Sequence, residues 1–136
     1  MAATLRLEIV TPDTIAYSED VEMVTLVGAD GELGVYPNHV PLLTTLQPGE
    51  LRVLKGGRET YLAVGEGFVE IKGDAVSVLT DVAIEASQID LGATEAAVAR
   101  AQAAMKEDHS AEEVAAIQAT LQKALAQMHV KRRRHS

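Results

Sequence analysis

The sequence predicts an α+β protein, with an N-terminal antiparallel β-sandwich followed by a C-terminal antiparallel two-helix hairpin. Turn-forming residues indicate the division, because all four prolines lie at or before Pro48 and nine of the ten glycines lie at or before Gly73. Apolar and polar residues alternate with a period of two in the first part, whereas the remainder has the spacing of amphipathic helices. We therefore expect two domains, residues 1–87 and 88–136.

Alternation and turn signals predict the strands of the first domain. Residues 5–9 alternate apolar and polar side chains, as in a half-buried strand, and residues 21–27 are apolar on both parities, as in a strand covered on both faces. Lys-Gly-Gly-Arg at 55–58 and Lys-Gly-Asp at 72–74 each separate two apolar runs and predict hairpins. Many short strands with such turns favour a sandwich or flattened barrel.

Two capping-box spacings predict the helices of the second domain. Ser87 and Asp90 have this spacing, and so do Ser110 and Glu113. The predicted helices are residues 89–106 and 111–131. The apolar seam between them consists of Leu91, Val98, Met105, Val114, Ile117, Leu121, Ala124 and Met128, with Leu125 beside it. Because this seam is thin and flanked by alanine, we expect helices that separate or dock elsewhere at little cost.

Composition argues against several classes of function. The net charge of −8 disfavours a general nucleic-acid partner, and the acidity is concentrated in residues 1–87, with 14 acidic and 5 basic residues, against 6 and 7 in residues 88–136. Without cysteine, disulfides and cysteine metal sites are excluded. No apolar run is long enough to span a membrane, and the first residues alternate, so we expect neither a transmembrane segment nor a signal peptide.

The most distinctive stretch is GELGVYPNHVPLLTTL at residues 31–46. It predicts a loop, a short strand, a rigid corner and a buried apolar segment. Pro37 and Pro41 fix φ in the corner and supply no backbone donor, so the corner does not extend a sheet. Glu32 and His39 are then displayed near this stiff corner.

This stretch resembles the epsilon subunit family of bacterial and chloroplast F-type ATP synthases. The resemblance also includes VEMV at residues 21–24 and GFVEI at residues 67–71, and it covers essentially the whole chain. It implies a non-catalytic rotor subunit with a sandwich of about ten strands, which packs on the gamma subunit and rests on the c-ring. The C-terminal helices of that family move between a contracted and an extended form, and the extended form restrains ATP hydrolysis.

The resemblance also implies residue roles and a location. Glu32 and His39 match positions expected to face the c-ring, and membrane contact is expected only through this ring, at the cytoplasmic face of the bacterial inner membrane. The beta subunits are expected to meet the second helix, and the alpha subunits are further expected partners. The residues expected at the beta and gamma contact are Lys123, Lys131, Arg132, Arg133 and Arg134. Without a partner, the last four are a solvated helix terminus favoured by the helix dipole.

A partial nucleotide motif opens the first predicted helix. Some family members bind ATP through Ile-Asp-x-x-Arg-Ala, of which Ile89 and Asp90 match, while Ala93 replaces the arginine and Thr94 the alanine. The loss of a guanidinium removes charge-assisted hydrogen bonds of about 1.5–3 kcal/mol each. We therefore expect no tight ATP binding and no cofactor.

Catalytic and metal-binding alternatives are weak. His39 has no neighbouring nucleophile or second ligand, and the four histidines lack metal-site spacing, so an interface or structural role is favoured. Gly28, Gly31 and Gly34 do not match a phosphate loop and indicate turns. A small hydrolase or sugar-binding sandwich needs a clustered site or aromatic platforms, yet the chain has no tryptophan and one phenylalanine. A freestanding adaptor explains the hairpin but not the proline corner.

Overall fold

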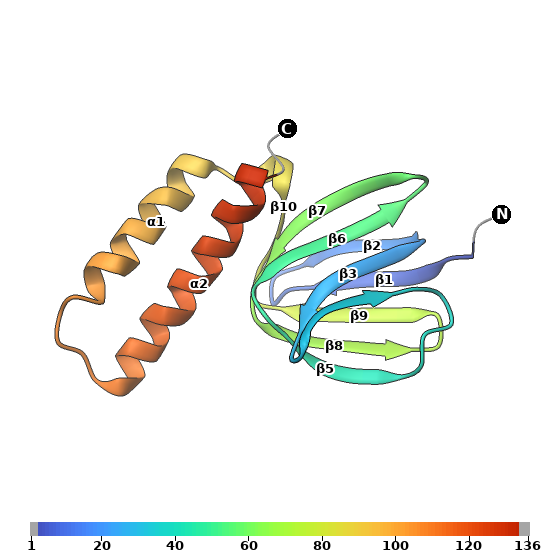
Figure 1. Ribbon diagram of the computed structural model, residues 1–136, viewed down its shortest axis with the longest axis horizontal. Coiled ribbons are helices and arrows are strands. Elements are labelled where there is room, and N and C mark those ends of the chain that lie inside the picture. Colours follow the sequence, from blue (N-terminus) through green and yellow to red (C-terminus); the bar gives the residue numbers. More distant parts are fainter. Residues whose placement is uncertain (1–2, 134–136) are drawn as a thin grey trace.

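The computed structural model describes residues 3–133, which form ten strands, a short 3₁₀ helix and two α-helices (Figure 1). The strands are β1 Leu5–Val10, β2 Ile15–Val21, β3 Met23–Gly28, β4 Gly31–Val35, β5 Leu42–Leu46, β6 Gly49–Lys55, β7 Arg58–Val64, β8 Gly67–Lys72, β9 Ala75–Thr80 and β10 Ala83–Glu85. The helices are η1 Ala86–Gln88, α1 Leu91–Ala104 and α2 Ala111–Arg133. The predicted fold class is confirmed.

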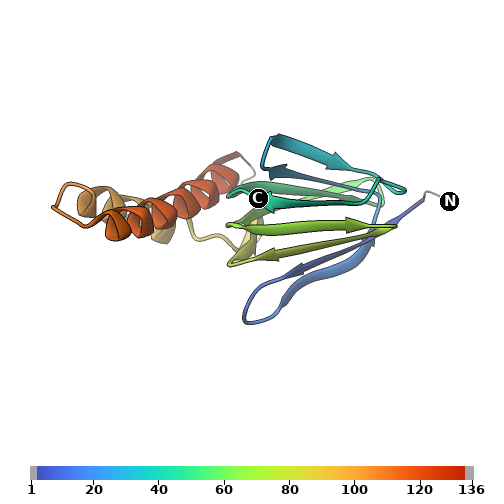
Figure 2. The same cartoon turned by 90° about the horizontal axis from the view of Figure 1, so that it is seen from below.

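The strands form one sheet in the order β10-β7-β6-β3-β5-β8-β9-β1-β2, with β4 paired to β3. This sheet closes into two layers, and the helices project from one end of them (Figure 2). Neighbouring strands are antiparallel except β1 and β9, which are parallel. The largest fully buried side chains between the layers include Leu7, Ile9, Leu26, Leu46, Leu51, Leu62 and Ile71.

The strand predicted over residues 21–27 forms as β3, with both parities buried at Val24 and Thr25, but it begins later than predicted because the chain bends at Glu22 between β2 and β3. The Glu22 carboxylate accepts hydrogen bonds from the backbone N–H groups of Gly56 and Gly57 at 2.6 and 3.3 Å. Because the Glu22 carboxylate is held by the β6–β7 turn, Glu22 does not take a core-facing position within a strand. The bend passes the chain from one sheet layer to the other.

Both predicted hairpins are confirmed. Gly56 and Gly57 have φ of 59° and 75°, as a two-residue type I′ turn requires. Gly73 has φ of 61° and joins β8 to β9. These left-handed conformations strain residues that carry a Cβ atom, which explains the glycines.

An ion pair links edge strand β2 to β6 across the open side of the sandwich. The Lys55 ammonium donates to the Glu19 carboxylate, and this hydrogen bond holds the pKa of Glu19 below its usual value. Partial burial, and then the Glu19 carboxylate, raise the pKa of nearby Tyr17 to about 12.

One of the two predicted capping boxes forms. The Glu113 N–H donates to Ser110 Oγ at 3.2 Å, and the Ser110 N–H donates to Glu113 Oε1 at 3.3 Å, so α2 begins as predicted. The capping box predicted at Ser87 does not form, because Ser87 lies in η1 and Asp90 is itself the N-cap of α1. The Asp90 carboxylate accepts from the Ala93 N–H at 3.0 Å.

Helix α2 is the middle layer of the helical end. It packs on α1 along one side and on β6, β7 and η1 along the other, and Figure 1 shows α1 on the far side of α2 from the strands. The predicted seam is only partly buried: Val98 and Ala124 are buried, whereas Leu125 is exposed. The antiparallel arrangement of the predicted hairpin is confirmed.

Candidate functional site

An apolar row crosses the outer face of one sheet layer. The strand register places Ile15 beside Val10, Val10 beside Leu79, and Leu79 beside Phe68. Ile15, Leu79 and Phe68 are 60%, 51% and 58% exposed. A contiguous row of large apolar side chains in water is typical of a protein–protein interface.

Strand β5 extends this apolar face, which corrects the predicted buried segment. Leu46 is buried, but Leu43 is 68% exposed. Leu43 lies on β5 beside β8, where its register partner is Glu70, two residues from Phe68. The segment is apolar on both faces of the strand, and one of these faces points out of the sandwich. We call Ile15, Val10, Leu79, Phe68 and Leu43 the apolar row.

The proline corner between β4 and β5 is attached to the neighbouring hairpin. Asn38 has a left-handed φ of 67°, which asparagine tolerates better than most residues. Its N–H donates to Asp74 Oδ1 in the β8–β9 turn at 2.8 Å. Tyr36 and Val40 flank this tether and are exposed. The corner therefore presents apolar side chains on a backbone held by two prolines and one hydrogen bond.

The two residues expected to face a partner ring lie at opposite ends of β4. Glu32 is beside the β3–β4 turn, and its carboxylate lies 4.0 Å from the Arg52 guanidinium. His39 follows the other end of β4, in the corner, and its Nδ1 lies 2.6 Å from the Val40 carbonyl oxygen. The structure does not bring Glu32 and His39 into one site.

The end of α2 is docked on the sandwich through one buried side chain. Val130 is fully buried and packs with Ala63 of β7, Ala86 of η1 and Ile89. This cluster is separate from the main core between the sheet layers and is much smaller. Its size fits the expectation that the helices are held with modest energy.

Two lysines complete the docking. Lys123 Nζ lies 2.6 Å from Asp81 Oδ2 in the β9–β10 connection. Lys131 Nζ donates to the Ala86 carbonyl oxygen at 3.0 Å. Both members of the Lys123–Asp81 pair are partly exposed, so solvent weakens their attraction.

The rest of the predicted basic cluster also has internal contacts. The Arg132 guanidinium lies 3.6 Å from the Glu95 carboxylate of α1, and Arg133 lies 3.4 Å from Nε2 of His129. Arg134 falls outside the described residues. In this arrangement the cationic end of α2 is partly engaged within the molecule.

The partial nucleotide motif lines a depression of about 380 Å³ beside α2. Ile89 and Asp90 reach this site together with Lys123 and Ala93. The carboxylate of Asp90 caps α1, and Lys123 is paired with Asp81, while Ala93 offers no side-chain donor. Lys123, the one cation in this lining, is therefore already paired, and the prediction about ATP binding stays a prediction.

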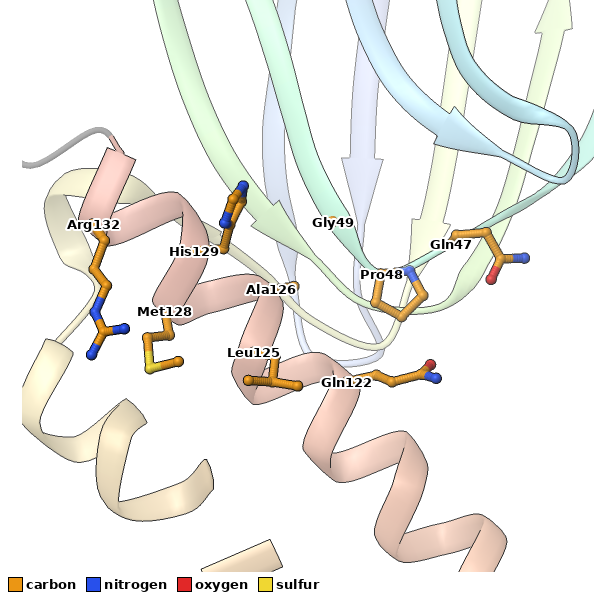
Figure 3. A pocket seen from close by; sticks show the side chains of 9 residues that line it. All are labelled: Gln47, Pro48, Gly49, Gln122, Leu125, Ala126, Met128, His129 and Arg132. Atoms are coloured by element: carbon orange, nitrogen blue, oxygen red, sulfur yellow. The ribbon is translucent and has the colours of Figure 1, made fainter. Parts of the chain in front are cut away.

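A larger depression of about 540 Å³ lies between α2 and the turn that precedes β6 (Figure 3). Gln122 extends toward Gln47 and Pro48, and Leu125 and Met128 also line it. Its lining contains no carboxylate and no nucleophilic thiol or hydroxyl. Because helix and sandwich each supply one wall, the depression exists only while α2 is docked.

Neither a metal centre nor a membrane span is found in the described part of the chain. Within residues 3–133, no three histidine or acidic side chains are placed to hold a metal ion. No helix among these residues is long and apolar enough to cross a membrane.

Sequence reasoning missed the apolar row and the contacts that dock α2. Phe68 and Leu79 lie on the outward parity of β8 and β9, so the alternation contained a signal for the row. The pairing of Lys123 with Asp81 had no local signal, because the two residues are distant in sequence.

Comparisons with known proteins agree on one family. Residues 4–86 match the family described as ATP synthase, Delta/Epsilon chain, beta-sandwich domain. The ATP synthase epsilon chain of Desulforamulus reducens is 43% identical over 125 residues, covering 92% of this chain and 95% of the relative. ATP synthase epsilon chain 2 of Syntrophotalea carbinolica is 44% identical over 131 residues, covering 96% and 95%.

Two solved structures share the fold. One is a chain of the Euglena gracilis mitochondrial ATP synthase OSCP/F1/c-ring, with a TM-score of 0.79, 23% identity, and coverage of 93% of this chain and 80% of that one. The other belongs to the central stalk and c-ring of the Tetrahymena thermophila mitochondrial ATP synthase, with a TM-score of 0.64, 11% identity, and coverage of 96% and 98%.

Proposed function

The chain belongs to the ATP synthase delta/epsilon family and is a non-catalytic ATP synthase subunit, and from this premise we propose its role in the complex. It is a rotor component of the central stalk that links the gamma subunit to the c-ring during proton-driven ATP synthesis. Its C-terminal helices restrain ATP hydrolysis. The observation that carries this proposal is the contrast between a well-packed sandwich and a helical pair attached to it through the small Val130 cluster.

The apolar row is the proposed attachment to gamma. A subunit that turns with a shaft needs an interface that does not slip, and burial of large apolar side chains supplies such an interface. Phe68 and Leu79 are the central members of the row and lie on neighbouring strands. They stand on the rigid sandwich, so they are arranged for a partner before it binds.

The ring contacts are proposed for the two ends of β4. Glu32 is largely exposed and only loosely paired with Arg52, so its charge remains available to a partner. His39 belongs to the proline corner, which also exposes Tyr36 and Val40. Since these ends are apart, we propose that Glu32 and His39 touch different parts of the rotor, and that the membrane is met only through the ring.

The C-terminal helices are the proposed brake. When α2 leaves the sandwich, Lys123 and Lys131 lose their internal partners and become available to the alpha and beta subunits. Arg132, Arg133 and Arg134 continue the same cationic end. Charged side chains exposed in this way favour acidic surfaces on a partner. We propose that the chain is a peripheral subunit at the cytoplasmic face of the bacterial inner membrane.

The test is removal of residues 88–136 from the chain in the assembled ATP synthase. We expect faster ATP hydrolysis with unchanged recovery of gamma, because the sandwich keeps its own core. Unchanged hydrolysis would remove the braking role and leave the rotor role intact.

A second variant tests the rotor role. Phe68→Glu with Leu79→Glu places two charges in the apolar row and is expected to abolish co-purification with gamma. Leu125→Glu, at an exposed position of α2 outside the apolar row, is the control that retains it. Undiminished gamma binding by the first variant would refute the proposed attachment.

A further inference from the structure

His109 lies in the turn between α1 and α2, and both of its ring nitrogens face hydrogen-bond acceptors. Nε2 lies 2.6 Å from the Ala104 carbonyl oxygen at the end of α1, and Nδ1 lies 3.2 Å from Glu113 Oε2 in the first turn of α2. The side chain is only 14% exposed. Two acceptors require two N–H donors, and a neutral imidazole has one. The geometry is therefore that of an imidazolium ring.

The groups that His109 contacts are themselves the ends of the two helices. The Ala104 carbonyl belongs to the last turn of α1, where a positive charge is favoured, and it also accepts from the Glu107 N–H at 3.2 Å. Glu113 accepts from Ser110 N–H through its other oxygen and so closes the capping box of α2. One charged ring thus joins the end of one helix to the start of the next.

We propose that His109 is a protonation-dependent clamp, which holds the two helix ends together when it is charged and releases one of them when it is neutral. Three charged or polar neighbours define its setting. Glu113 faces it from α2, Glu107 from the turn at 3.9 Å, and the neutral Ala104 carbonyl from α1. Both carboxylates favour the charged ring.

The pH range of the clamp follows from its two partners. The hydrogen bond to Glu113 raises the pKa of His109 above its ordinary value of 6.5, so its contribution is complete below 6.5 and is lost as the pH rises through the raised value. The same bond lowers the pKa of Glu113 below 4.5, so that contribution is present above 4.5 and is lost as the pH falls through the lowered value. The clamp is therefore closed between the lowered pKa of Glu113 and the raised pKa of His109, and it opens when the pH rises above the pKa of His109.

The clamp lies in the turn that joins the two helices along the chain. The two helices separate from each other only if the turn changes shape, and an uncharged His109 removes one of the contacts that resist this change. An effect on the contracted and extended forms follows if the helices move as proposed above, and this consequence rests on the proposed function. The clamp itself does not.

The experiment uses the isotopically labelled full chain. Imidazole ¹⁵N shifts of His109 are recorded by NMR from mildly acidic to mildly alkaline pH, together with amide exchange of residues 104–113 corrected for intrinsic rates. We expect both ring nitrogens to be protonated at the acidic end, and exchange in the turn to increase several-fold as the ring loses its proton. The sandwich strands serve as the internal reference and are not expected to show this step.

Variants locate the effect. His109→Gln keeps a side-chain donor but does not titrate, so the step should vanish, whereas the matched control His129→Gln should retain it. Glu113→Gln should move the midpoint toward lower pH. A single protonated nitrogen in the wild-type ring at the acidic end, or a step that persists in His109→Gln, would overturn the clamp. Because this readout uses the chain alone, its failure is distinct from a failure of the hydrolysis test.

Discussion

Truncation of Val130 tests how α2 is held on the sandwich. Val130→Ala removes two methyl groups from a side chain with no exposed surface, in a cluster with Ala63, Ala86 and Ile89. At about 0.8 kcal/mol for each buried carbon, plus the cost of the space left behind, the loss is about 2 kcal/mol. This loss should fall on docking of α2, because Val130 does not contribute to the main core.

Amide hydrogen exchange measures this loss directly. A docking free energy reduced by about 2 kcal/mol raises the open population, and hence the exchange rate of α2 amides, about 30-fold. Exchange in the sandwich should remain unchanged. Val40→Ala makes the same chemical change at an exposed residue of the proline corner and should leave α2 unaffected. An α2 exchange rate within about threefold of wild type would refute docking through Val130, and so would an equal rise in β6 and β7.

Three further predictions concern other parts of the molecule. Gly67→Ala would place a Cβ atom 1.7 Å from a carbonyl oxygen of β9, so thermal unfolding should show a loss of about 2 kcal/mol or more. Gly34→Ala, whose Cβ atom would meet nothing nearer than 3.9 Å, should be tolerated. The pKa of Tyr17 is raised to about 12, so the stability that its neutral form contributes to the fold should be complete below about pH 10 and lost as the pH rises through 12. Phenolate absorbance should show a titration near pH 12 that is absent in Tyr17→Phe. A double-mutant cycle on Lys123 and Asp81 should give a coupling below about 1 kcal/mol that shrinks with added salt, because both groups are partly exposed; a larger, salt-independent coupling would contradict this.

Local signals predicted much of the fold. The turn glycines Gly56, Gly57 and Gly73 located two hairpins, because positive φ restricts which residues fit. Ser110 and Glu113 located the start of α2, because both partners of a capping box lie within one turn. The same spacing misled at Ser87, where the aspartate at the second position was a sufficient N-cap alone.

Long-range pairing was beyond these signals. The parallel contact of β1 with β9 depends on how the whole sheet closes, and neither strand carries a pattern specific to it. Strands β2 and β10 were not predicted, since β2 contains mixed polar residues and β10 is short. The candidate site followed the same division. The resemblance suggested roles for Glu32 and His39, whereas the internal partners of Lys123 and Val130 required the tertiary structure.

The place of α2 between α1 and the strands also determines what each kind of movement releases. Helix α1 packs extensively on α2. If α2 dissociates from β6 and β7, α1 moves with it, and the short segment after β10 is the hinge. Opening the turn alone leaves the packing of α2 on the strands in place and removes one restraint on α1. We therefore expect a partner that binds α2 to act on both helices, and one that binds α1 to act first on the outer helix.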